Sequence, residues 1–83
     1  MKYCVIVETL NQMIQHFSKP IIKYFNTKEE AEVEFGDNCI HLINQGFNII
    51  YQDIDEENNF IEKRFSNGYF TVTLVLSSEE ELI

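Results

Sequence analysis

The chain has few of the residues from which common catalytic and ligand-binding motifs are built. Among 83 residues there are three glycines, one proline, two cysteines and no tryptophan. The glycines form no phosphate-binding loop, so the known nucleotide-binding motifs are excluded. No serine lies in a Gly-x-Ser-x-Gly elbow, and neither cysteine has a histidine placed to activate it. The sequence therefore predicts a protein that is not an enzyme and has no catalytic residues.

Cysteine and histidine are also too scarce for a metal centre or a disulfide framework. Cys4 and Cys39 lie in apolar segments without CxxC spacing, so we expect both to be reduced core residues. His16 and His41 have no partners at metal-site spacing and are interpreted as surface residues. We expect no cofactor and no metal.

Long apolar runs are missing as well. No stretch approaches the ~18 apolar residues of a membrane span, and the N-terminal apolar run ends at Glu8, too early for a signal peptide. We therefore expect a cytoplasmic protein that does not bind membranes. Apolar residues still make up 45% of the chain, which is typical of a folded domain. Residues 1–83 are interpreted as one domain, whose small core leaves self-association open.

The first part of the chain contains two predicted strands with an ambiguous segment between them. The run Lys2–Leu10 is rich in β-branched and aromatic residues, which favours a buried strand. Residues 10–17 have helical spacing of apolar side chains, so a short helix is predicted, with an irregular strand extension as the alternative. Pro20 precedes the run Ile21–Phe25, which we expect to be a strand at a sheet edge.

The main helix is predicted over residues 28–45. Thr27 and Glu30 form a capping box at its start, and Gly46 follows its end. Gly36 lies inside the helix and costs about 1 kcal/mol relative to alanine. An apolar stripe suited to packing on a sheet is formed by Ala31, Phe35, Cys39, Leu42 and Ile43.

After this helix the hydrophobic period changes from 3.6 residues to two. Phe47, Ile49 and Tyr51 then share one strand face, and Ile50 and Ile54 share the other, which predicts a strand to about residue 54.

Two further strands, over residues 60–65 and 69–76, are predicted to form a hairpin. Asn67-Gly68 between them is the strongest short signal for a two-residue turn. Such a turn pairs Ser66 with Tyr69, Phe65 with Phe70, Lys63 with Val72 and Ile61 with Leu74. One face is then apolar except for Lys63, and the other is polar. Residues 77–83 are expected to fray as an acidic tail.

Together these elements predict an α+β domain. It has an antiparallel sheet of four to five strands with one main helix packed on one face. The expected order is a first strand, a short helix or loop, an edge strand, the main helix and a three-stranded meander.

Charge is distributed unevenly along the chain. The formal net charge is −8, and residues 29–62 contain ten acidic residues and no Lys or Arg. Residues 1–28, by contrast, have a net charge of +3. The candidate partner-binding residues are seven of these acids: Glu30, Glu34 and Asp37, expected as an exposed ridge opposite the apolar stripe of the helix, and Asp53, Asp55, Glu56 and Glu57 around the next turn.

Two interpretations of this acidic surface remain open. It keeps a small protein soluble, or it docks on the basic groove of a protein that binds nucleic acid. The same charge argues against direct binding of nucleic acid. The stretch Asp53–Asn58 has part of a calcium-loop pattern, but the glycine at the sixth position is missing and Arg64 replaces the closing glutamate, so an EF-hand is rejected.

The segment Phe25–Glu32, followed by Gly46-Phe47, has the pattern of a strand, a helix and a second strand. With its small size, acidity and many Asn and Ile residues, the chain resembles small acidic proteins encoded by phages of low-GC hosts. Their inhibitors of host defence include anti-CRISPR proteins, often single α+β domains that occlude nucleic-acid channels. The resemblance implies an inhibitor that docks on a basic, nucleic-acid-binding effector, and it transfers no functional residue. The alternatives are an antitoxin or immunity protein, and a homodimeric regulatory or ligand-binding module that associates through Tyr69, Phe60 and Val75.

Overall fold

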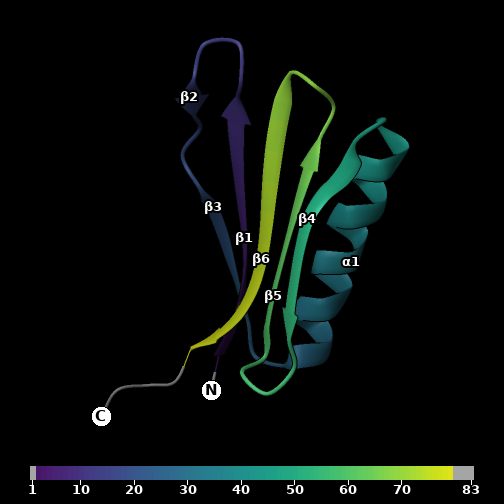
Figure 1. The fold of residues 1–83 in the computed structure, drawn as a ribbon. Helices are drawn as coiled ribbons and strands as arrows, with labels where there is room; N and C mark the ends of the chain where they lie inside the picture. Colours follow the sequence, from purple (N-terminus) through teal and green to yellow (C-terminus); the bar gives the residue numbers. More distant parts are fainter. Residues whose placement is uncertain (1, 80–83) are drawn as a thin grey trace.

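The computed structural model describes residues 2–79. Its elements are, in order, β1 (Lys2–Asn11), β2 (His16–Phe17), β3 (Ile21–Phe25), α1 (Lys28–Asn44), β4 (Asn48–Asp55), β5 (Phe60–Ser66) and β6 (Phe70–Glu79). All strands pair antiparallel in one sheet, and α1 packs against it (Figure 1). The predicted α+β class is confirmed. Of the tail predicted to fray, residues 77–79 extend β6, and residues 80–83 lie outside the described residues.

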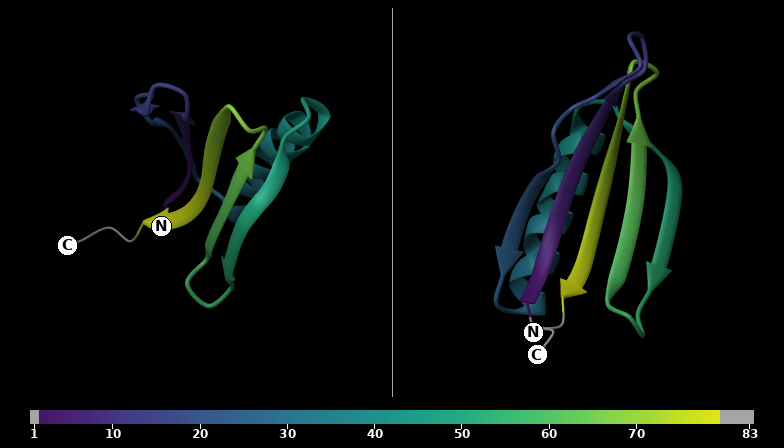
Figure 2. Two further views of the ribbon diagram at one scale, coloured as in Figure 1. Left: turned by 45° about the horizontal axis from the view of Figure 1, so that its top comes forward. Right: turned by 90° about the vertical axis from the view of Figure 1, so that its left-hand side faces the viewer.

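The sheet has the order β2-β1-β6-β5-β4, and β3 pairs with β1 on the same side as β2. β3 therefore lies at one edge, directly after Pro20, as predicted. Among residues 2–79, β4 pairs only with β5 and forms the opposite edge. α1 connects these two edges and crosses one face of the sheet, whereas the other face is open (Figure 2).

The short helix predicted over residues 10–17 is wrong. β1 continues to Asn11, the chain turns, and β2 returns beside it with Phe17 opposite Leu10. Gln15 takes a φ of 54° in this turn, a left-handed conformation that a helix does not contain. The segment follows the alternative, a strand extension: pairing with β6 keeps β1 extended through Leu10 and Asn11, and β2 then pairs with these same two residues.

α1 begins and ends where its caps predict. Thr27 accepts the backbone N–H of Glu30 at 3.2 Å, and Gly46 follows the helix with a φ of 90°. The buried side chains of the helix are Ala31, Phe35 and Leu42, and Cys39 is half-buried. The prediction that Ile43 belongs to the buried stripe is wrong. Ile43 is 52% exposed because it lies about 100° around the helix from Leu42.

The hydrophobic core lies between α1 and one face of the sheet. Its buried members are Val5, Ala31, Phe35, Leu42, Phe65, Val72, Leu74 and Leu76. α1 packs mainly on β1, β6 and β3, so the same face of β4 and β5 is less covered. That uneven cover leaves side chains of β4 exposed.

The β5–β6 hairpin is offset by two residues from the predicted register. Its pairs include Ser66 with Thr71, Phe65 with Val72, Lys63 with Leu74 and Ile61 with Leu76. Three residues, Asn67, Gly68 and Tyr69, join the two strands. Asn67 is not a central turn residue, because its N–H donates to Phe70 O at 3.2 Å and its Oδ1 accepts the N–H groups of Tyr69 at 2.9 Å and Phe70 at 2.8 Å. In this loop only Gly68 has a positive φ, whereas the predicted two-residue turn needs two such residues. A slip of two residues keeps every side chain on its face, so the predicted polar and apolar faces are confirmed.

A β-bulge interrupts β4. Pairing with β5 passes from Ile49 opposite Phe65 to Tyr51 opposite Arg64, and Ile50 is left without a partner in the register. Ile49 and Tyr51 therefore lie on opposite faces of the sheet. The prediction that they share a face is wrong, because the extra residue reverses the alternation.

Candidate interaction surface

The start of α1 and the turn between β4 and β5 lie at the same end of the molecule (Figure 1). A cavity of about 440 Å³ lies between them. Six acidic residues belong to these two segments and are called here the acidic end: Glu29, Glu30, Glu32, Asp55, Glu56 and Glu57. The chain thus brings together two groups of carboxylates more than twenty residues apart in sequence.

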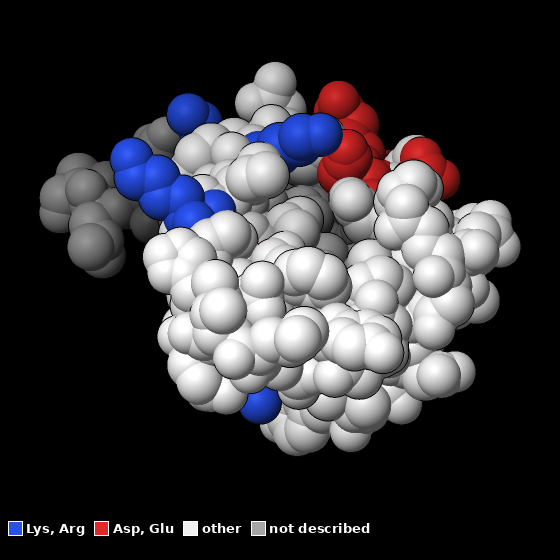
Figure 3. All heavy atoms as spheres, turned by 90° about the horizontal axis from the view of Figure 1, so that it is seen from above, with Lys and Arg blue, Asp and Glu red and all other residues white. Residues whose placement is uncertain are grey.

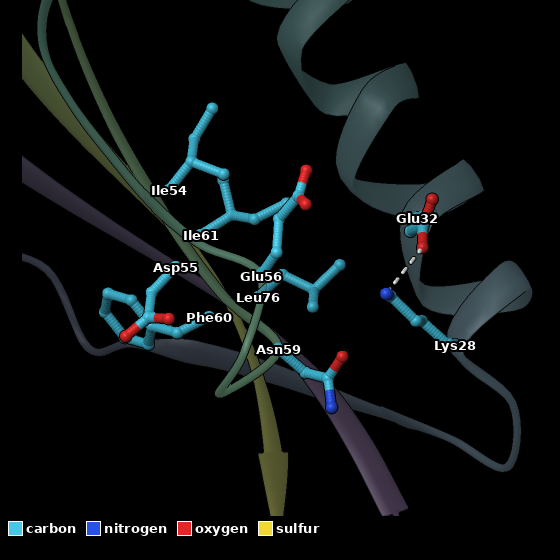
Figure 4. A pocket seen from close by; sticks show the side chains of 9 residues that line it. All are labelled: Lys28, Glu32, Ile54, Asp55, Glu56, Asn59, Phe60, Ile61 and Leu76. Carbon is cyan, nitrogen blue, oxygen red and sulfur yellow. Dashed lines mark ion pairs between the residues drawn. The ribbon is translucent and has the colours of Figure 1, made fainter.

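The cavity has charged walls and an apolar floor. Glu32 on α1 and Glu56 on the turn lie on opposite sides of it (Figure 4). The apolar lining residues include Ile54, Ile61 and Leu76. Lys28 also lines the cavity, and its Nζ lies 3.8 Å from Glu32 Oε1. Both side chains of this i,i+4 pair are well exposed, so it contributes only about 0.3–0.5 kcal/mol and leaves Glu32 accessible to another cation.

Asp55 holds the turn together. Asn58 donates two hydrogen bonds to its carboxylate, from Nδ2 to Oδ2 at 2.7 Å and from the backbone N–H to Oδ1 at 3.3 Å. These hydrogen bonds, the side-chain one first, lower the pKa of Asp55. Glu56 and Glu57 are exposed and form no ion pair with another residue between positions 2 and 79. They are the carboxylates of this turn that are accessible to a partner.

The predicted acidic ridge along α1 is interrupted at Glu34. This side chain is 23% exposed, and its Oε1 lies 3.0 Å from Lys23 Nζ on β3. The expected position opposite the buried stripe is wrong for Glu34, because it lies only about 60° around the helix from Ala31. Glu30 accepts a hydrogen bond from the capping threonine at 2.9 Å, and Asp37 is exposed farther along the helix.

Asp53, the remaining predicted residue, lies on the open face of the sheet opposite Glu62. Glu62 Oε2 accepts hydrogen bonds from Arg64 at 2.7 Å, and the guanidinium lies 4.7 Å from the centre of the Tyr51 ring. Sequence reasoning did not propose this cluster as a site, although the hairpin pattern placed Arg64 and Glu62 on the polar face. The depression beside it, of about 340 Å³, is lined by Glu8, Leu10, Phe17, Glu62, Arg64, Thr71 and Thr73.

The three residues of the alternative dimer interface do not form one patch. Tyr69 lies in the β5–β6 loop, Phe60 begins β5 at the other end of the molecule, and Val75 lies between them on the open face.

Within residues 2–79, no group of three or more His, Cys, Asp or Glu side chains has the geometry of a metal site. His16 and His41 are both exposed, as predicted. Cys4 is buried, Cys39 is half-buried, and no disulfide joins them. Burial raises the pKa of the Cys39 thiol, although Lys63 opposes this, so Cys39 favours the protonated form. No helix in the described part of the chain is long and apolar enough to cross a membrane.

Fold and surface define a small α+β protein, in which the described residues form one helix against a six-stranded antiparallel sheet and acidic residues gather at one end. A scan against protein-family models, a search of curated proteins and a search of solved structures each found no match.

Proposed function

We propose that this chain is a non-enzymatic binding protein whose acidic end docks on a basic surface of a protein that binds nucleic acid. The observation that carries the proposal is that Glu32 of α1 and Asp55 and Glu56 at the β4–β5 turn line one cavity. Sites for nucleic acid are positively charged because they match a dense row of phosphates. A compact group of carboxylates competes for such a site, which favours an inhibitor of the kind that phages encode against host defence.

The cavity suits the side chain of a lysine or arginine. Such a side chain can place its charged group between Glu32 and Glu56 and lay its aliphatic stem along Ile54 and Ile61. Lys28 already lies 3.8 Å from one oxygen of Glu32, so the partner residue must compete with it for this carboxylate. Arginine is better suited than lysine, because its planar group presents several N–H donors to a carboxylate at once.

The first experiment is affinity purification from the source cell at low and at high salt. We expect a basic partner that is retained at low salt and released at high salt, because screening weakens contacts between exposed charges. The class of the recovered protein then separates two variants of the proposal, an inhibitor of a nucleic-acid-binding effector and an antitoxin or immunity protein.

Charge reversal then tests the surface. We expect Glu56→Lys to weaken binding to the recovered partner by about tenfold or more. The comparison variant Asp37→Lys makes the same change in net charge at a residue that the sequence predicted to bind a partner but that lies outside the acidic end, and we expect a loss of less than about threefold. Equal losses in the two variants would assign the effect to net charge, and unchanged affinity in Glu56→Lys would show that the acidic end is not the docking surface.

A further inference from the structure

The two edges of the sheet are protected to different degrees. β3 follows Pro20 and carries Lys23, which is paired with Glu34 on α1. Proline and lysine on an edge strand discourage pairing with another chain. β4 has neither residue type, and its exposed apolar side chains are Ile49, Ile50, Tyr51 and Ile54, each between 45% and 58% exposed.

The first five residues of β4, 48–52, also lie in an uncharged part of this acidic chain. Residues 38–52 contain no Asp, Glu, Lys or Arg, although the net charge is −8. Two copies that pair β4 antiparallel around Ile50 and Tyr51 would place Asp53 of each opposite Asn48 of the other. The two Asp53 residues would then lie about 17 Å apart, which is about twice the Debye length at physiological salt. Self-association at this edge therefore lessens, without removing, the repulsion between two acidic molecules.

The shape of the molecule favours this edge over its uncharged end. Charged side chains are few at the end of the molecule seen in Figure 3, and the chain has three charge-free segments, 9–18, 38–52 and 65–78. The molecule measures 43 × 23 × 18 Å, so this end spans only about 410 Å² (23 by 18 Å). A stable interface takes about 800 Å² from each partner. β4 has eight residues and is about 27 Å long, which exceeds either dimension of that end.

We propose that the free edge of β4 is the contact between two copies of this chain, joined across a two-fold axis into one continuous antiparallel sheet. A β-bulge by itself discourages edge pairing. Here, however, it leaves Ile50 without a cross-strand partner and 58% exposed, free to contact the second copy. The antiparallel arrangement keeps the two acidic ends at opposite ends of the dimer. The dimer does not depend on the proposed docking function.

Light scattering coupled to size exclusion tests this contact. Over about a hundredfold range of concentration we expect the mass to rise from 9.8 kDa, that of one chain, to about twice this value. Ile50→Lys places two like charges beside the two-fold axis, and we expect it to weaken dimerisation at least about tenfold. Ile21→Lys on β3 is the matched control, because Ile21 is 59% exposed, and it should dimerise like the parent. Circular dichroism verifies that both variants are folded.

A parent chain with the mass of one copy at every concentration would overturn the proposal. A dimer that persists in Ile50→Lys would assign the contact to another surface and would overturn it equally. Added salt should strengthen the dimer, because it screens repulsion between two copies, whereas it should weaken docking on a basic partner. The dimer at β4 and the docking of the acidic end can therefore each be refuted without refuting the other.

Discussion

At the residue scale, the carboxylates of this protein divide into those that the fold uses and those left for a partner. Glu30 completes the helix cap, Glu34 pairs with Lys23, Glu62 holds Arg64, and Asp55 accepts the hydrogen bonds of its turn. Glu29, Glu56 and Glu57 are exposed and form no ion pair with another residue in the described range. A partner is expected to meet this second group, because contact with it disrupts no interaction of the fold.

The titration of Asp55 tests the structure of the acidic turn. Asn58→Ala removes the hydrogen bond that contributes most to the lowered pKa of Asp55, so we expect this pKa to rise toward its ordinary value. NMR titration of the Asp55 carboxyl carbon measures it. Asn26→Ala, in the exposed loop before α1, should leave the pKa of Asp55 unchanged. An unchanged value in Asn58→Ala would contradict the turn described above.

The sign of the stability effect follows from linkage. A pKa that is lower in the folded state stabilises the fold above the ordinary pKa of aspartate, and this contribution is lost as the pH falls through the folded value. When the pH is lowered from neutral to acid, the free energy of unfolding of Asn58→Ala should therefore fall less than that of the parent.

At the element scale, two glycines of the α1 region have opposite conformational requirements. Gly36 lies inside the helix, and a Cβ added there would meet nothing within 4 Å. Gly46 follows the helix with a φ of 90°, in the left-handed region that disfavours every residue with a side chain. Helix propensity therefore decides the effect at Gly36, and backbone strain decides it at Gly46.

Alanine at these two positions should change stability in opposite directions. We expect Gly36→Ala to raise the free energy of unfolding by about 1 kcal/mol, because alanine is the better helix former. We expect Gly46→Ala to lower it by about 1 kcal/mol or more through strain. Urea denaturation of the two variants beside the parent measures both, and each serves as the other's control. Destabilisation by Gly36→Ala would show that the helix needs the space at that position.

The elements also show how far local sequence patterns predict structure. The caps and the 3.6-residue period of α1 predicted its bounds to within one residue, because a helix closes its hydrogen bonds within a few residues. The segment after Thr9 was predicted less well. Its helical spacing is outweighed by a pairing partner, β6, that lies sixty residues later. Local propensity cannot include a contact of that range.

At the scale of the whole molecule, a net charge of −8 on a chain of 83 residues opposes the compact state by self-repulsion. At low protein concentration, where association does not contribute, we expect the melting temperature to rise when salt is raised from about 20 mM to about 0.5 M. The double variant Glu56→Lys, Glu57→Lys, with a formal charge of −4, should show a smaller rise, since each reversal adds two positive charges. A melting temperature that falls with salt would show that favourable ion pairs outweigh the repulsion.

The sequence by itself determined the α+β class, the edge position of β3, both ends of α1 and the polar and apolar faces of the hairpin. These properties depend on caps, turns and hydrophobic periods, which act over a few residues. It also identified the acidic side chains of the candidate surface, but not which of them form ion pairs or hydrogen bonds within the fold. Lys23, for example, lies eleven positions from Glu34 in sequence and pairs with it only because β3 and α1 lie side by side.

Only the tertiary structure decided the hairpin offset, the bulge in β4 and the meeting of the two acidic groups. A slip of two residues leaves every face unchanged, so alternation cannot distinguish the two hairpin registers. The acidic end exists because α1 crosses the sheet from β3 to β4, which places the start of the helix beside the β4–β5 turn. Such proximity depends on the path of the whole chain, and no local pattern contains it.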